Sequence, residues 1–101
     1  MRIIWSALAL GRVSEAADYI ARDNPRAAEN WVSEIFDLVS RLSEHPQRGR
    51  VVPEVGRAEI RELFFGSYRV IYRVEQNRVV ILTVRHGRRL LEKAELSNRE
   101  E

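Results

Sequence analysis

The spacing of the apolar residues changes once along this chain, near Pro46. Before that residue, apolar side chains recur every three or four positions, as they do on one face of a helix. After it, they alternate with polar side chains or form short runs, which is typical of strands. The sequence therefore predicts a helical part that is followed by a sheet within one chain.

Two helices are expected in the helical part, after a short apolar strand at residues 2–5. Ser6 is a suitable N-cap for the first helix, which should end near Arg22. Asn24 and Pro25 suit the N-cap and the first position of the second helix, which should stop before the next proline. The apolar faces would be formed by Leu10, Val13, Ala17 and Ile20 in the first helix and by Ala28, Val32, Ile35, Val39 and Leu42 in the second.

Three strands are expected after the change of period, at residues 59–65, 68–74 and 79–84. Tight turns would join them, and residues 47–57 before them are interpreted as a loop. The fold class is α+β with the order β-α-α-β-β-β, a helical hairpin packed on a small antiparallel or mixed sheet. Residues 1–101 would be a single domain in which residues 88–101 form a C-terminal tail, with residues 90–97 weakly helical and available to pack on a partner.

The chain has 101 residues and no Cys. This length fits one modest hydrophobic core. Without Cys there is no disulfide framework, no Cys-ligated zinc and no thiol nucleophile. Two His with scattered carboxylates form no metal-ligand pattern, and no glycine-rich phosphate loop occurs, so we expect no metal and no cofactor. The apolar runs are too short for a membrane span, and a cytoplasmic protein is the expectation.

Arginine dominates the cations, with 16 Arg and one Lys. Residues 46–91 carry 10 Arg and four Glu, whereas the segments on either side carry more acids than cations. Such a basic segment is typical of a surface for phosphates or acidic partners, although codon composition is an alternative explanation. If the strands pair as neighbours, one concave patch would gather Arg61, Arg69, Arg73, Arg85, His86, Arg88 and Arg89.

Several short motifs follow one another in order: DNPRAA at 23–28, HP at 45–46, IREL at 60–63, YRVIYRV at 68–74 and VRHGRR at 84–89. Together they resemble toxins of the RelE/ParE superfamily of type II toxin–antitoxin systems, over about residues 3–91. The resemblance implies the α+β fold described above. It also implies a growth-arresting toxin that forms a hetero-oligomer with a cognate antitoxin, the product of an adjacent gene.

The resemblance implies two possible modes of action, and only one of them is enzymatic. ParE-like toxins poison DNA gyrase, whereas RelE-like toxins are ribosome-dependent mRNA endonucleases that need no metal. The long helical hairpin and the HGRR ending favour the ParE-like mode. A net charge of +2 is also low for a protein that must hold ribosome and mRNA. A degenerate member that only binds its antitoxin is the third possibility.

The candidate site residues differ between the two modes. In a nuclease, the resemblance implies that Arg61 and Arg69 stabilise the negative charge that develops on the phosphate. His86 would then be a proton donor or acceptor, and Glu54 a base. In a gyrase poison, contacts to the target would come from Arg48, Arg50, Arg73, Arg85, Arg88 and Arg89. Ordinary ion pairs between neighbouring strands are the structural alternative for all of these residues.

Overall fold

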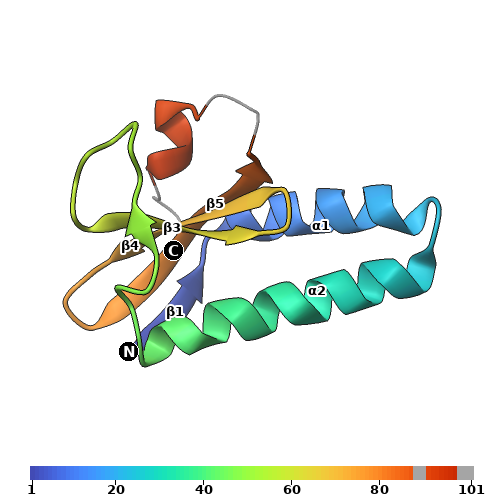
Figure 1. The fold of residues 1–101 in the computed structure, drawn as a ribbon, viewed down its shortest axis with the longest axis horizontal. Coiled ribbons are helices and arrows are strands. Elements are labelled where there is room, and N and C mark those ends of the chain that lie inside the picture. Colours follow the sequence, from blue (N-terminus) through green and yellow to red (C-terminus); the bar gives the residue numbers. More distant parts are fainter. Residues whose placement is uncertain (88–90, 98–101) are drawn as a thin grey trace.

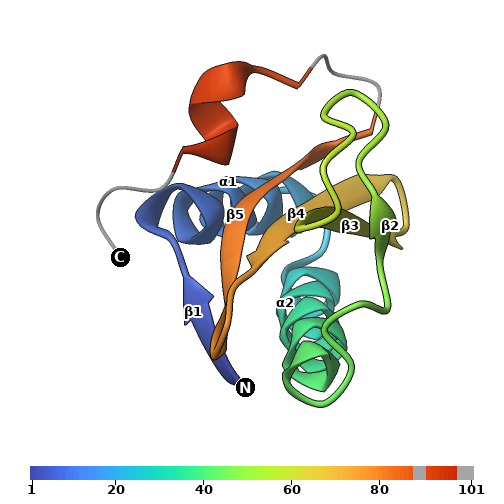
Figure 2. The same ribbon diagram turned by 90° about the vertical axis from the view of Figure 1, so that its left-hand side faces the viewer.

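The computed structural model describes residues 1–87 and 91–97. Two helices lie on one side of a five-stranded sheet, and a short 3₁₀ helix near the C-terminus lies on the other (Figure 1, Figure 2). The elements are β1 Arg2–Trp5, α1 Ala7–Ala21, α2 Pro25–Ser40, η1 Arg41–Ser43, β2 Arg50–Val51, β3 Ile60–Phe65, β4 Tyr68–Val74, β5 Arg78–His86 and η2 Lys93–Leu96. The predicted class and order are confirmed, with β2 as an added strand.

The helix starts lie where the capping residues predict them. The side chain of Ser6 accepts a hydrogen bond from the backbone N–H of Ala9 at 3.0 Å, and that of Asn24 accepts one from Ala27 at 3.1 Å. Pro25 occupies the first turn of α2, where its missing N–H costs nothing. These caps fix both helix starts, so α1 and α2 form the expected hairpin.

The sheet has the strand order β1-β5-β4-β3-β2. The first strand lies parallel to the last one, β5, and the remaining pairs are antiparallel. The chain therefore leaves the sheet after β1, forms the helical hairpin and returns to build the other four strands. Since β5 pairs on both sides, it is an interior strand of the sheet, as its apolar sequence indicates.

A bulge in β5 keeps the side chains before and after it on the same face of the sheet as their partners in β4. Tyr72 pairs with Ile81, but Ile71 pairs with Thr83, so Leu82 is an extra residue. Because of this insertion, Ile81 on one side of the bulge and Val84 on the other both face the helices.

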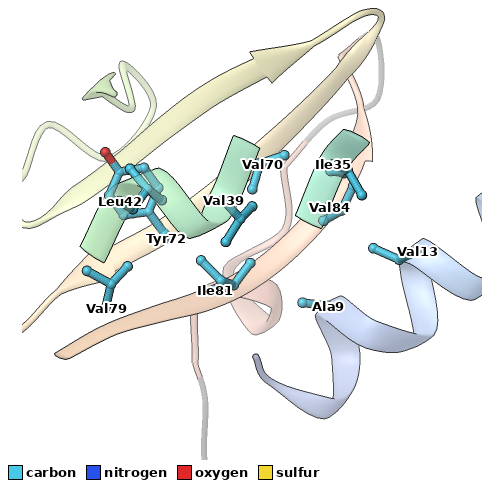
Figure 3. Packing of buried hydrophobic residues seen from close by; sticks show 10 residues of the cluster. All are labelled: Ala9, Val13, Ile35, Val39, Leu42, Val70, Tyr72, Val79, Ile81 and Val84. Carbon is cyan, nitrogen blue, oxygen red and sulfur yellow. The ribbon is translucent and has the colours of Figure 1, made fainter. Parts of the chain in front are cut away.

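The main core lies between the helices and the inner face of the sheet (Figure 3). Ile35 and Val39 of α2 and Leu42 of η1 are buried there, as predicted. Their partners on the sheet are Val70, Tyr72, Ile81 and Val84. Trp31 and Val32 pack at the edge of the same cluster.

The buried face of α1 differs from the prediction. Ala9, Val13 and Ala16 are its buried residues, whereas Leu10 is 45% exposed. Two of the three buried residues are alanines, and their small side chains let the helix backbone lie close to β5 and α2. A larger residue such as Leu10 does not fit at this short distance, so the helix is rotated toward its small side chains.

The outer face of the sheet has a second apolar cluster, built on Ile60, Ile71, Val80 and Leu82. Leu91 and Leu96 of the C-terminal segment pack against it. The tail was expected to be available to a partner, and this expectation is wrong for residues 91–97, which cover the protein's own sheet. None of the helices in the described part of the chain is long and apolar enough to cross a membrane.

Candidate functional site

The outer face of the sheet carries a group of ion pairs around Glu62 of β3, whose side chain is fully buried. One of its carboxylate oxygens accepts a hydrogen bond from Nε of Arg69 at 2.6 Å, and the other accepts one from Nε of Arg50 at 2.7 Å. A buried carboxylate is stable only when its charge is compensated and its oxygens are hydrogen-bonded. Glu62 therefore depends on these two arginines.

Arg69 of β4 is bound by a second carboxylate, that of Glu54. Its Nη1 and Nη2 donate to the two oxygens of Glu54 at 2.8 and 3.0 Å, in a bidentate pair. All three nitrogens of this guanidinium therefore donate to carboxylates of the same chain. The hydrogen bond from Arg69 lowers the pKa of Glu54 below its usual 4.5, and the bond to Glu54 raises the pKa of Arg69. Glu54 is thus a weakened proton acceptor.

Arg61 lies on the opposite face of the sheet from Arg69. It is paired in register with Tyr72, which faces the helices. Nη1 of Arg61 donates to the carbonyl of Gly49 at 2.8 Å, and the Tyr72 hydroxyl accepts the N–H of Gly49 at 2.8 Å. Burial raises the pKa of Tyr72, which stays a neutral hydrogen-bonding group. Arg61 and Tyr72 therefore hold the loop before β2 in place.

Gly49 has a structural reason to be glycine. A Cβ at this position would collide with the backbone of Glu62 and the hydroxyl of Tyr72. The close approach lets residues 50–51 pair with β3. The sequence pattern indicated only a loop here, because a strand of two residues has no period to recognise.

His86 ends β5 on the helix-facing side. It pairs in register with Tyr68, and the two rings meet edge to face with 5.6 Å between their centres. Together with Arg12, Glu15 and Tyr19 of α1, they line a cleft of about 250 Å³. Arg69 pairs with Arg85, the residue before His86. The His86 and Arg69 side chains therefore extend from opposite faces of the sheet.

That neighbouring residue, Arg85, belongs to a buried group centred on Glu95 of η2. Glu95 forms ion pairs with Arg85 and, at 3.4 Å, with Nη2 of Arg12. It also accepts a hydrogen bond from the hydroxyl group of Thr83 at 2.9 Å. These contacts fasten the C-terminal segment to the sheet and to α1, so Arg85 serves as an anchor within the fold.

The remaining candidate cations are distributed around the molecule. Arg73 and Arg78 share the carboxylate of Glu75. Arg48 is exposed in the loop after α2, and Arg88 and Arg89 lie outside the described residues. The prediction of one concave patch is therefore wrong for the part that the structure describes. Alternate residues of a strand face opposite sides of a sheet, so Arg61 is separated from Arg69 and Arg73, whereas Arg85 and His86 at the end of β5 line one cleft.

Three carboxylates on the outer face of the sheet and in η2 are bound by arginines. Within residues 1–87 and 91–97, no group of three or more His, Cys, Asp or Glu side chains is placed to hold a metal ion. On the outer face, Glu54 and Glu62 bind guanidinium groups, and Glu95 does the same beside η2. These three carboxylates therefore support the structure, because each is bound by a guanidinium group.

One surface feature was not found from the sequence. A groove of about 520 Å³ lies between α1 and α2, near the turn of the hairpin. Its lining residues are Ala17, Asp18, Ala21, Pro25, Ala28, Glu29, Val32 and Ser33. The alanines on both helices were the available signal, because small residues at a helix crossing leave a furrow between larger neighbours. They were interpreted as part of the core instead.

Comparison with known proteins gives a consistent result. The family model described as "ParE toxin of type II toxin-antitoxin system, parDE" matches residues 3–91. The chain is 39% identical to toxin Y4kP of Sinorhizobium fredii, over 85% of this chain and 88% of that protein. It is 31% identical to toxin RelE2 of Caulobacter vibrioides, over 88% of this chain and 98% of that one.

Two solved structures have the same fold. One is the chromosomal ParDE system from P. aeruginosa, with a TM-score of 0.71, 21% identity and coverage of 85% of this chain and 95% of that chain. The other is the toxin–antitoxin complex RelBE2 from Mycobacterium tuberculosis, with a TM-score of 0.60, 23% identity and coverage of 84% and 95%. At these identities the likeness concerns the fold alone.

Proposed function

Because this chain belongs to the ParE toxin family and is a toxin of a type II toxin–antitoxin system, we propose that it arrests growth by binding and poisoning DNA gyrase. In this mode the toxin is a protein-binding inhibitor and catalyses no reaction of its own. A cognate antitoxin, encoded next to it, neutralises the toxin by binding it.

The engagement of Arg69 carries this proposal. Cleavage of RNA through its own 2′-hydroxyl needs a base, an acid and a cation at one phosphate. Here the guanidinium of Arg69 is occupied by Glu62 and Glu54, and His86 extends from the other face of the sheet. An inhibitor that acts by surface contact needs no such constellation, so the geometry favours the ParE-like mode.

One observation favours a second candidate function, a ribosome-dependent mRNA endonuclease. Glu54 and Arg69, two residues of the nuclease set, are in direct contact, and a relative of 31% identity is named toxin RelE2. If Glu54 moved away, Arg69 would become available to a phosphate. This alternative requires that the ion pair opens on the ribosome.

A paired assay separates the two modes. Purified toxin should inhibit supercoiling by gyrase, and primer extension on mRNA from induced cells should show no toxin-dependent cuts. Site-specific cuts with unchanged supercoiling would reverse the assignment. Inactivity in both assays, with the antitoxin still bound, would indicate a degenerate member.

The variant His86→Ala tests the same point by a different route. A gyrase poison should tolerate it, because no proton transfer is involved, and growth arrest on induction should persist. A nuclease that uses His86 should lose about 10²-fold or more of its cleavage. His45→Ala is the matched control, since this exposed histidine lies outside the cleft between α1 and β5.

The antitoxin has a surface that suits it on the sheet side of the molecule. Residues 50–86 carry seven Arg and four Glu, an excess of positive charge that acidic antitoxin residues would complement. Co-expression with the product of the adjacent gene should give a stable complex on gel filtration. Separate elution of the two proteins would contradict this part of the proposal.

A further inference from the structure

Three hydrogen-bond donors converge on the carboxylate of Glu95. Nη2 of Arg12 lies 3.4 Å from one of its oxygens, and a guanidinium nitrogen of Arg85 pairs with the other. The hydroxyl group of Thr83 donates to the first of these oxygens at 2.9 Å. Only 6% of the Arg85 side chain and 4% of the Glu95 side chain are exposed. Two guanidinium groups and a hydroxyl group around one buried negative charge are the donor set of an anion-binding site.

The carboxylate in this site belongs to a short C-terminal segment, whereas its donors belong to the body of the fold. The donors extend from α1 and β5, which both pack into the main core. Glu95 lies in η2, on the side of the sheet opposite α2 (Figure 2). The same segment packs on the outer face of the sheet through Leu91 and Leu96. An anion that took over the three donors would therefore release this segment without disrupting the core between the helices and the sheet.

A cleft at the end of β5 connects two of the donors with solvent. Arg12 and Arg85 both line this cleft of about 250 Å³. Its volume is below the roughly 300–1,000 Å³ that is typical of sites for drug-sized ligands, and it suits a small group such as a phosphate. Glu15 lines the cleft as well, but its carboxylate is exposed to water, which screens its charge. An anion can therefore approach the two arginines through the cleft.

We propose that Arg12, Thr83 and Arg85 form a phosphate-binding site, which the carboxylate of Glu95 occupies when no phosphate is bound. Arginine binds phosphate and carboxylate groups in the same bidentate manner, so the donors that hold Glu95 also suit a phosphate group. A phosphate group that enters the cleft displaces the carboxylate and releases residues 91–97 from the sheet. The inference goes beyond the proposed function and does not depend on which target the toxin has.

Removal of the internal carboxylate tests the site. Glu95→Gln keeps the size of the side chain and an oxygen for Thr83, but it removes the charge that competes with phosphate. Its affinity for inorganic phosphate, measured by titration calorimetry at constant ionic strength, should exceed that of the wild type about tenfold or more, because a tethered competitor acts at a high effective concentration. The matched control is Glu92→Gln, which makes the same charge change at an exposed position of the same segment and should leave the affinity unchanged.

Two further variants examine the donors and the release of the segment. Arg12→Gln combined with Glu95→Gln should lose the gain in phosphate affinity, because it removes one of the donors. Leu96→Ala should raise the phosphate affinity, since it weakens the packing of the segment and leaves every donor in place. In the wild type, saturating phosphate should speed backbone hydrogen exchange in residues 91–97.

Three results would overturn the inference. The first is an equal phosphate affinity for the wild type, Glu95→Gln and Leu96→Ala, and the second is a gain in affinity that chloride reproduces at the same concentration. The third is unchanged hydrogen exchange in residues 91–97 at saturating phosphate. Thermal melts followed by circular dichroism verify folding, and if Glu95→Gln fails to fold, Leu96→Ala decides the question.

A short oligonucleotide without terminal phosphates identifies the source of the phosphate group. If it competes with inorganic phosphate for the Glu95→Gln variant, the site takes a phosphate of a nucleic-acid backbone. If it does not compete, the site takes a free phosphate ion or a phosphate monoester. Inhibition of gyrase by the wild type is measured separately, and its absence would refute the proposed function while leaving the phosphate site intact.

Discussion

The sheet and the helical hairpin carry opposite charge and use it differently. In the sheet, Arg69 and Arg85 are almost fully buried and bound to carboxylates of the same chain. In the hairpin, Asp18 and Glu29 are exposed at the rim of an open groove. The sheet is thus the more charged region, but its buried arginines are already bound to carboxylates. The more accessible charges lie on the helices.

This difference separates residues that build the molecule from residues that can contact another one. Arg69 donates one N–H from each of its three nitrogens to internal carboxylates, so only two of its five N–H groups are left for a partner unless an ion pair breaks. Arginine content by itself therefore overestimates the binding surface of the sheet. The hairpin has fewer cations, and its acidic residues Asp18 and Glu29 are exposed.

The largest effect should come from breaking the ion pairs of the sheet at Glu62. Glu62→Ala leaves buried Arg69 without one of its two carboxylates, and removing one partner of a buried pair costs about 3–5 kcal/mol. The free energy of unfolding from a denaturant melt measures this loss. Glu59→Ala is the control, since that carboxylate is partly exposed and pairs with the exposed Arg57. If the two variants melted alike, the network around Glu62 would be incidental.

The second prediction concerns the two sides of α2. Ile35 is fully buried against the sheet. The substitution Ile35→Ala should lower the free energy of unfolding by roughly 2–5 kcal/mol, because it leaves a cavity in the core. Glu29→Ala, on the groove side of the same helix, should change the stability within about 0.5 kcal/mol. A loss below about 1 kcal/mol for Ile35→Ala would show that the inner face of α2 does not carry the packing.

The smallest effect should appear in the pH dependence of stability. Because Arg69 lowers the folded-state pKa of Glu54 below 4.5, this ion pair stabilises the protein above that pH and stops doing so as the pH falls through the folded pKa. Glu54→Gln should therefore reduce the difference in denaturant midpoint between neutral and acidic solution. If the variant and the wild type showed the same difference in denaturant midpoint, solvent would fully screen the ion pair between Glu54 and Arg69.

Much of the fold could be predicted because its signals are local. Ser6 and the pair Asn24–Pro25 mark helix starts by their own chemistry, and the alternation in residues 68–74 marks β4. The buried face of α1 was missed because small residues, which pack closely, do not stand out in a pattern of large apolar ones. Strand β2 was missed because Gly49 sets its position through contacts with β3 and β4, which lie far along the chain.

The candidate site was less predictable because its geometry depends on register. The turn at Gly66 and Ser67 pairs Phe65 with Tyr68, and this register puts Arg61 opposite Tyr72 on the inner face. One residue of slip would have placed Arg61 on the outer face. Residue types alone therefore identified the arginines, but they did not tell which of them were anchors.

The parallel pairing of β1 with β5 has a consequence for how the toxin is made. Arg2 lies beside Arg78, so the first strand has no neighbour until the last strand has been synthesised. Ser6 also bonds to the backbone of Ile81 and Leu82, which links the start of α1 to the same late segment. A chain cut short before residue 78 lacks the middle of its sheet and cannot close its core. We therefore expect a fragment that lacks β5 to remain unfolded and to cause no growth arrest.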